Sequence, residues 1–138
     1  MDRHGWIDEQ LSKVPLFTGL DKKHLKQISG LMTQIDVAAG KDLTREGAHG
    51  SEFVIILEGE AEVKVDGKVV ATRGPGDYFG EIALIANRPR TATVTAITPM
   101  RIEVIGRREF QTLLNENPGI ATELLGATAD RLAENDHA

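Results

Sequence analysis

The sequence predicts a mainly β domain with flanking helices, in which a β-roll (jelly-roll) follows a helical N-terminal segment and precedes two helices. Apolar residues recur at helical spacing near both ends of the chain. Between them, short apolar stretches alternate with turn-forming residues at intervals of about 8–12 residues, which is typical of a sandwich or barrel. We expect one domain over all 138 residues, with helices over about 1–33, the roll over 34–106 and the last helices over 107–136.

The first predicted helix begins after Asp21, which is a plausible N-cap. Leu25, Ile28, Leu31 and Met32 then follow at the spacing of a single apolar helix face.

The middle of the chain carries the strand signals. Alternation of apolar and polar residues over 60–66 and 91–97 predicts strands with one face turned inward. Asp66-Gly67 is a strong two-residue hairpin signal. Residues 53–57 are continuously apolar, which predicts a strand buried on both faces.

Helical spacing returns near the C-terminus. A first helix carries Phe110, Leu113 and Leu114 and is stopped by Asn117-Pro118. The second helix presents a broad apolar face made by Ile120, Leu124, Leu125 and Leu132.

The segment 79–94, FGEIALIANRPRTATV, interrupts the roll and carries the strongest functional signal. Gly80 opens a short helix-like turn, and the first N–H groups of a helix suit an anion because they lack intrahelical partners. Arg90 supplies a planar fork of donors matched to phosphate oxygens, each charged hydrogen bond contributing roughly 1.5–3 kcal/mol. An ion pair between Glu81 and Arg90 is the purely structural alternative, although such a pair is also compatible with an empty anion site.

Composition narrows the function further. The net charge is −5 and no run of Lys or Arg exists, so nucleic-acid binding by this chain is not expected. Cysteine is absent and no apolar run reaches the ~18–20 residues of a membrane span, so we expect a cytoplasmic protein without membrane association.

Motifs for catalysis and for metal or cofactor binding are missing. The four histidines lack metal-ligand spacing, and neither a P-loop nor a dinucleotide fingerprint occurs. We therefore expect no enzyme, no metal and no cofactor.

Two motifs at a fixed distance, F-G-E-x-A-L and P-R-T-A-T-V, resemble the phosphate-binding cassette of the cyclic-nucleotide-binding domain family. That family includes the catabolite activator protein and the regulatory subunits of cyclic-nucleotide-dependent kinases, and the sequence looks bacterial in style. The resemblance covers about residues 11–132 and implies a site for a 3′,5′-cyclic nucleotide. The residues that it implies are Arg90, Thr91, Ala83, Leu84 and Ala92 for the cyclic phosphate, and Gly80 and Glu81 for the ribose.

The resemblance also suggests where the base lies. An inward-facing set of valines, Val63, Val65 and Val70, is the candidate wall, and Asn135 and Asp136 on the last helix are candidates for capping the base. These valines are equally compatible with a role in the core, and the last helix with simply covering the roll. Thr91 is compatible with a contact either to phosphate or to the guanine amino group, and we expect cAMP to be favoured over cGMP.

The expected function is a sensor module that binds the cyclic nucleotide and signals through movement of its terminal helices to an effector protein or an attached output domain. The alternative is a degenerate member of the fold that has lost its ligand and acts as a protein-interaction scaffold.

Overall fold

The computed structural model describes residues 9–85 and 87–133. Residues 9–12 are helical. The elements that follow are η1 (Pro15–Phe17), α2 (Lys22–Ser29), β1 (Thr33–Val37), β2 (Asp42–Thr44), β3 (Glu52–Glu58), β4 (Ala61–Val65), β5 (Lys68–Arg73), β6 (Tyr78–Phe79), α3 (Glu81–Ile85), β7 (Thr93–Ala96), β8 (Met100–Gly106), α4 (Arg107–Glu116) and α5 (Pro118–Ala133).

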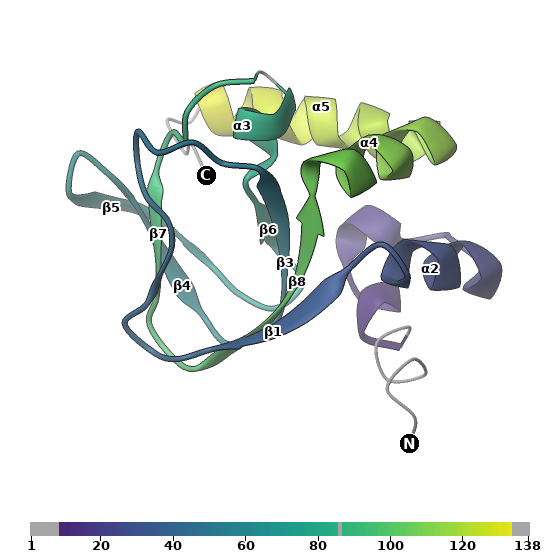
Figure 1. Ribbon diagram of the computed structural model, residues 1–138, viewed down its shortest axis with the longest axis horizontal. Coiled ribbons are helices and arrows are strands. Elements are labelled where there is room, and N and C mark those ends of the chain that lie inside the picture. Colours follow the sequence, from purple (N-terminus) through teal and green to yellow (C-terminus); the bar gives the residue numbers. More distant parts are fainter. Residues whose placement is uncertain (1–8, 86, 134–138) are drawn as a thin grey trace.

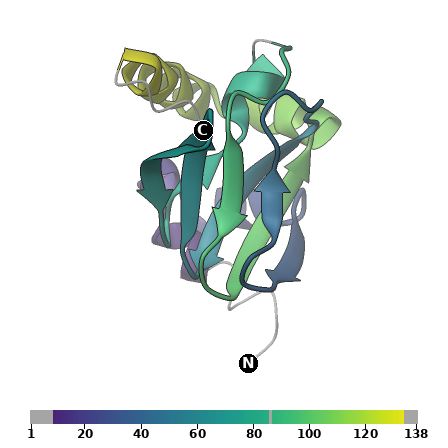
Figure 2. The ribbon, with the colours of Figure 1, turned by 90° about the vertical axis from the view of Figure 1, so that its left-hand side faces the viewer.

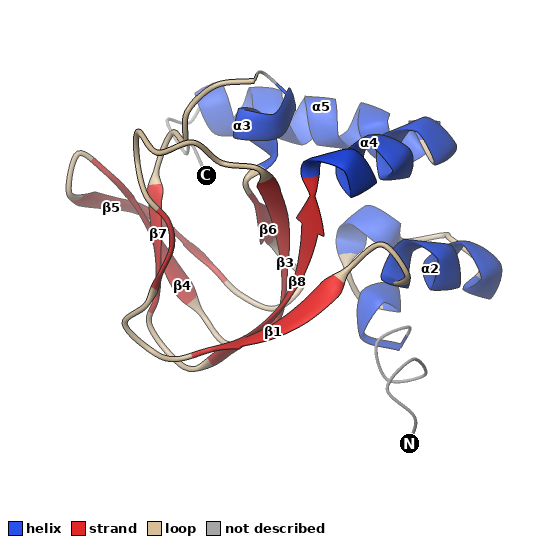
Figure 3. Cartoon of the chain, in the orientation of Figure 1, coloured by secondary structure: helices blue, strands red, loops and turns tan. Residues whose placement is uncertain are grey.

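The strands form two four-stranded antiparallel sheets that face each other as a β-roll (Figures 1 and 2). One sheet has the order β1-β8-β3-β6 and the other has the order β2-β7-β4-β5. Helices α3, α4 and α5 lie together along one end of the roll, while α2 lies near the start of β1, to which a short loop joins it (Figure 3). The mainly β architecture with flanking helices is therefore confirmed.

The predicted strand over residues 53–57 is buried on both faces, as β3 shows. Phe53, Ile55 and Leu57 pack into a helix-side core, which also contains residues of α2, α4 and α5. Val54 and Ile56 point the other way into a roll core between the sheets. Successive side chains of a strand alternate between faces, so a single strand contributes to both cores.

Helix α2 begins as predicted but ends early. The main-chain N–H of His24 donates to Oδ1 of Asp21 at 2.9 Å, so Asp21 is the N-cap. The helix stops at Ser29, before Gly30, because glycine disfavours the helical conformation. Leu31 and Met32 lie beyond it, half-buried against the helix-side core rather than on the helix.

The hairpin between β4 and β5 turns at Asp66-Gly67, as expected. Both residues have positive φ angles, 53° and 78°, which a type I′ turn requires. The expectation that Val70 faces inward beside Val63 is wrong. The register is irregular here, since Val63 pairs with Ala71 and Lys64 with Val69, and the extra residue Val70 is left 40% exposed.

The C-terminal helices separate at Asn117-Pro118, as predicted. Ile120 and Leu124 of α5 are buried, but Leu125 is 57% exposed, so the apolar face of α5 is narrower than the sequence indicates. No helix in the described part of the chain is long and apolar enough to cross a membrane.

Candidate functional site

A small pocket opens where β6 runs into α3 and where the chain enters β7. It measures about 230 Å³, including the part open to solvent. Its walls are Thr44, Phe79, Gly80, Ile82, Ala83, Arg90, Thr91, Ala92 and Val94. The pocket thus gathers most of the residues that the sequence assigns to a phosphate site.

Arg90 brings a buried positive charge to the pocket wall. Arg90 is only 9% exposed to solvent. Nη1 donates to the carbonyl oxygen of Gly80 at 3.1 Å and Nη2 to that of Glu52 at 2.8 Å. Burial lowers the pKa of Arg90 below its usual value, while the carboxylates of Glu52 and Glu81 oppose that shift. Arginine stays protonated even so, and these two bonds use two of its five N–H donors.

The position of Arg90 depends on Gly80. Gly80 has a φ of 95°, a conformation that favours glycine, and it links β6 to α3. A Cβ on Gly80 would lie 2.7 Å from Nη1 of Arg90. The glycine therefore provides both the turn into α3 and the space for the guanidinium.

Glu81 does not pair with Arg90, contrary to the structural alternative considered from the sequence. Its Oε1 instead accepts a hydrogen bond at 2.8 Å from Nη1 of Arg131 on α5. The guanidinium of Arg90 is held by main-chain carbonyls, whereas α5 brings Arg131 directly to the carboxylate.

Glu81 is fully buried, and its Oε2 has no hydrogen-bond partner within the described residues. Burial raises the pKa of this carboxyl above its ordinary value, and the nearby Arg131 only partly offsets the effect. A buried carboxylate oxygen without a donor is costly, so this atom is well suited to accept a hydrogen bond from a ligand.

Arg131 also contacts Tyr78, the residue before Phe79 in β6. Its Nη2 donates to the carbonyl oxygen of Tyr78 at 2.8 Å, and its guanidinium carbon lies 4.5 Å from the centre of the Tyr78 ring. A single side chain thereby ties α5 to both β6 and α3.

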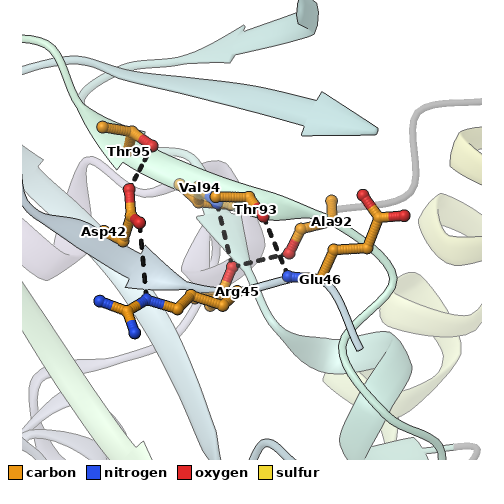
Figure 4. A network of polar contacts seen from close by, with 8 residues as sticks. Asp42, Arg45, Glu46, Ala92, Thr93, Val94 and Thr95 are labelled. Carbon is orange, nitrogen blue, oxygen red and sulfur yellow. Dashed lines mark hydrogen bonds and ion pairs between the residues drawn. The ribbon is translucent and has the colours of Figure 1, made fainter. Parts of the chain in front are cut away.

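A network of polar contacts fixes β7 against β2 beside the pocket (Figure 4). Thr44 is central, because its hydroxyl donates to the carbonyl oxygen of Ala92 at 3.0 Å and accepts from the N–H of Val94 at 3.1 Å. Thr95 donates to Asp42 at 2.6 Å farther along the same pair of strands. These bonds set the main chain that follows Arg90.

The loop of residues 45–51, between β2 and β3, holds the main chain of Arg90 itself. The N–H of Arg90 donates to the carbonyl oxygen of Ala48, and the N–H of Gly47 donates to that of Arg90, both at 2.8 Å. Glu46 in the same loop accepts a hydrogen bond from the N–H of Asp66, at the turn of the β4–β5 hairpin, at 3.0 Å.

The residues predicted for the cyclic phosphate and the ribose either line the pocket or are buried next to it. Arg90, Thr91, Ala83, Ala92 and Gly80 line the pocket. Glu81 lies fully buried at the start of α3, and the side chain of Leu84 packs in the helix-side core, so only its main chain is available to the site.

The predicted base contacts are dispersed. Val63 is fully buried and Val65 half-buried at the roll core. Val70 is exposed on β5. Asn135 and Asp136 lie outside the described residues.

No cluster of His, Asp and Glu within the described residues has the arrangement of a metal site. The pocket wall contains one cation, Arg90, with the side chains of Thr44 and Thr91, while the buried carboxylate of Glu81 lies next to Gly80 in the chain. A cationic wall of this kind suits an anionic ligand better than a metal ion.

The sequence model of the cyclic nucleotide-binding domain matches residues 34–117, which include the whole pocket. The chain belongs to the cyclic nucleotide-binding domain family. Among characterised relatives, the cAMP-dependent protein kinase regulatory subunit of Yarrowia lipolytica is 37% identical over 136 residues, 97% of this chain and 33% of that protein. The Schizosaccharomyces pombe regulatory subunit is 40% identical over 105 residues, 75% of this chain and 26% of that protein.

Solved structures show the same fold. A cAMP-bound PfPKA-R superimposes with a TM-score of 0.85 at 27% identity, over 99% of this chain and 48% of that one. A Trypanosoma cruzi regulatory subunit of a cAMP-independent protein kinase A, bound to guanosine, has a TM-score of 0.80 at 28% identity, over 93% of this chain and 46% of that one. The chain spans about a quarter to a third of the length of the two relatives.

Three features of this cyclic nucleotide-binding domain were missed by the sequence analysis. Arg131 lies 50 residues from Glu81, and no sequence spacing indicates that α5 packs back against Glu81. Thr44 ends β2, and the loop 45–51 joins β2 to β3, so both lie far in sequence from the segment 79–94. The sequence of this loop indicates a turn through Gly47 and Gly50, but it does not indicate a contact with Arg90.

Proposed function

We propose that this chain is a sensor domain that binds a 3′,5′-cyclic nucleotide, with cAMP preferred over cGMP. The observation that carries the proposal is the guanidinium of Arg90, buried at the wall of a pocket and fixed by two carbonyl oxygens. Its remaining donors, together with the main chain near Ala83 and Thr91, suit the oxygens of a cyclic phosphate.

Glu81 supports a nucleotide rather than a simple anion. Its Oε2 is buried and has no donor within the described residues, beside an Oε1 that Arg131 already holds. A ribose 2′-hydroxyl is a suitable donor for that oxygen. We propose that the cyclic phosphate and the ribose bind at this pocket and that the base lies outside it.

We also propose that ligand occupancy reaches α5 through the same carboxylate. Arg131 joins Glu81, Tyr78 and α5, so a hydroxyl arriving at Glu81 changes the surroundings of the bond that holds the helix. The ligand then favours one arrangement of α5 over another, as in any population shift.

The output of this domain is proposed to be a separate effector protein or an output domain in the same polypeptide. Its relatives are regulatory subunits of a protein kinase, which supports regulation rather than catalysis. We propose accordingly that the bound nucleotide is released unchanged, and chromatography after incubation with cAMP tests this directly.

Calorimetric titration of the purified chain with cAMP, cGMP, AMP and guanosine tests the proposed ligand. We expect the tightest binding for cAMP, with weaker binding for cGMP. Guanosine is included because a relative of the same fold binds it, and it has no phosphate for Arg90. Tighter binding of guanosine than of cAMP, or no heat with any of the four, would contradict the proposal.

The alternative of a scaffold that has lost its ligand is not favoured. A surface used only for protein contacts does not need a buried arginine and a buried carboxylate beside one pocket.

A further inference from the structure

Gly50 lies directly against the guanidinium of Arg90. A Cβ on Gly50 would lie within 2.5 Å of Nε, Cζ and Cδ of Arg90, whereas real Cβ atoms essentially never come closer than 3.0 Å to such a neighbour. Any larger residue at position 50 is therefore incompatible with the observed position of this side chain.

The guanidinium lies between two glycines. Gly80 contacts it near Nη1, and Gly50 contacts it along Nε and Cζ. The loop that contains Gly50 also binds the main chain of Arg90 through Gly47 and Ala48. The loop 45–51 thus holds Arg90 at both ends, through the main chain and through the guanidinium.

Arg107, the first residue of α4, forms a hydrogen bond with the main chain of Gly50. Its Nη2 donates to the carbonyl oxygen of Gly50 at 3.3 Å, and its Nη1 lies 3.5 Å from the carbonyl oxygen of Leu84 in α3. Arg107 therefore connects the loop 45–51 to α3, in addition to the contacts of that loop with Arg90.

We propose that Gly50 is the positioning residue of Arg90, and that it sets the guanidinium for phosphate without touching the ligand itself. The ligand part of this inference rests on the proposed function, whereas the contact between Gly50 and Arg90 does not. Since the atoms that a new Cβ would meet belong to a flexible side chain, the conflict is relieved by movement of Arg90 and not by unfolding.

Gly50→Ala is the direct test, with Gly74→Ala as its matched control. Gly74 also lies in a loop, but a Cβ there meets open space and its φ is not positive. We expect Gly50→Ala to weaken cAMP binding roughly 10- to 100-fold, the equivalent of one charged hydrogen bond, in a protein that still folds. Gly74→Ala should bind like the parent.

A double-mutant cycle separates positioning from a general effect on the fold. In an Arg90→Ala background, Gly50→Ala should have no further effect on affinity, because the side chain that it displaces is gone. An equal loss in both backgrounds would overturn the proposal. If Gly50→Ala fails to fold, folding of the double variant would support the contact, and failure of the double variant would overturn it.

A readout without ligand keeps this inference distinct from the proposed function. The Nε–H resonance of Arg90 in ¹⁵N NMR spectra should shift in Gly50→Ala and stay in place in Gly74→Ala. A shift in a protein that binds no cAMP would support the positioning role and refute the proposed ligand. Unaltered resonance and unaltered cAMP affinity in Gly50→Ala would refute the positioning role alone.

Discussion

Arg90 is the residue on which the proposed binding depends most. It is buried, oriented by two carbonyl oxygens, and part of the pocket wall. We predict that Arg90→Ala weakens cAMP binding by roughly 2–4 kcal/mol, since the substitution removes charge-assisted contacts and leaves the phosphate without its partner. Calorimetry measures the change.

Arg108→Ala is the control, because Arg108 is an exposed arginine of α4 away from the pocket. Both variants lose one positive charge, so a general electrostatic effect would weaken them equally. Equal affinities of the parent and Arg90→Ala would show that the phosphate lies elsewhere.

Glu81 predicts a pH dependence of stability. Its pKa is raised in the folded protein by burial, so folding favours the protonated form. The stability that protonated Glu81 contributes is fully present below pH 4.5, the ordinary pKa of this carboxyl group. It is lost as the pH rises through the higher pKa of the folded state. Glu81→Gln, which does not titrate, should lack this loss.

Urea unfolding of the parent and Glu81→Gln between about pH 4 and pH 8 measures the difference. Relative to the variant, the parent should become less stable as the pH increases over that interval. A difference that stays constant with pH would show that Glu81 keeps its ordinary pKa in the folded state.

At the scale of elements, α5 is held to the roll through Arg131. The side chain of Arg131 is 14% exposed and that of Glu81 is 0% exposed, so this ion pair is shielded from solvent. We predict that Arg131→Ala destabilises the protein by about 3 kcal/mol, because it leaves a buried carboxylate without its cation. Hydrogen exchange should also become faster in the last turns of α5.

Arg131→Lys provides the comparison for α5. Lysine keeps the charge but not the planar fork that reaches both Glu81 and the carbonyl of Tyr78, so it should recover only part of the lost stability. If Arg131→Ala unfolds at the same urea concentration as the parent, the ion pair does not hold the helix.

The elements that could be predicted are those with a local cause. Asp21 caps α2 through its own side chain, and Asp66-Gly67 forms a turn because its conformation suits these two residues. Val70 was misplaced because an irregular register between β4 and β5 depends on pairing across the sheet, which alternation within a single strand does not reveal.

The site divides in the same way. Gly80 and Arg90 lie ten residues apart, so their relation could be derived from one continuous segment. Thr44 reaches the pocket, and Arg131 reaches Glu81, through tertiary packing, and their positions along the chain do not reveal these contacts. The pairing of Glu81 with Arg131 rather than Arg90 is a result of that packing.

At the scale of the whole molecule, the two cores share one sheet. Ile55 and Ile56 are neighbours in β3, both fully buried, and they enter the helix-side core and the roll core respectively. We predict that Ile55→Ala and Ile56→Ala each destabilise the protein by about 2–5 kcal/mol. Because the strand is common to both cores, each variant should unfold in a single transition.

Thermal unfolding followed by circular dichroism and by calorimetry checks this coupling, since coincident transitions indicate one cooperative unit. Val69→Ala is the control, because Val69 is 53% exposed and belongs to neither core. Two separate transitions in Ile55→Ala would show that the helices and the roll unfold independently.

The loop 45–51 has a consequence for protein engineering. It touches Arg90 and the β4–β5 hairpin, yet none of its residues belongs to either core. Grafting the corresponding segment from another member of the family would thus alter the surroundings of the anion while leaving the packed interior unchanged. We expect such a graft to change the proposed ligand preference while it keeps both packed cores, provided that the grafted segment retains glycine at position 50.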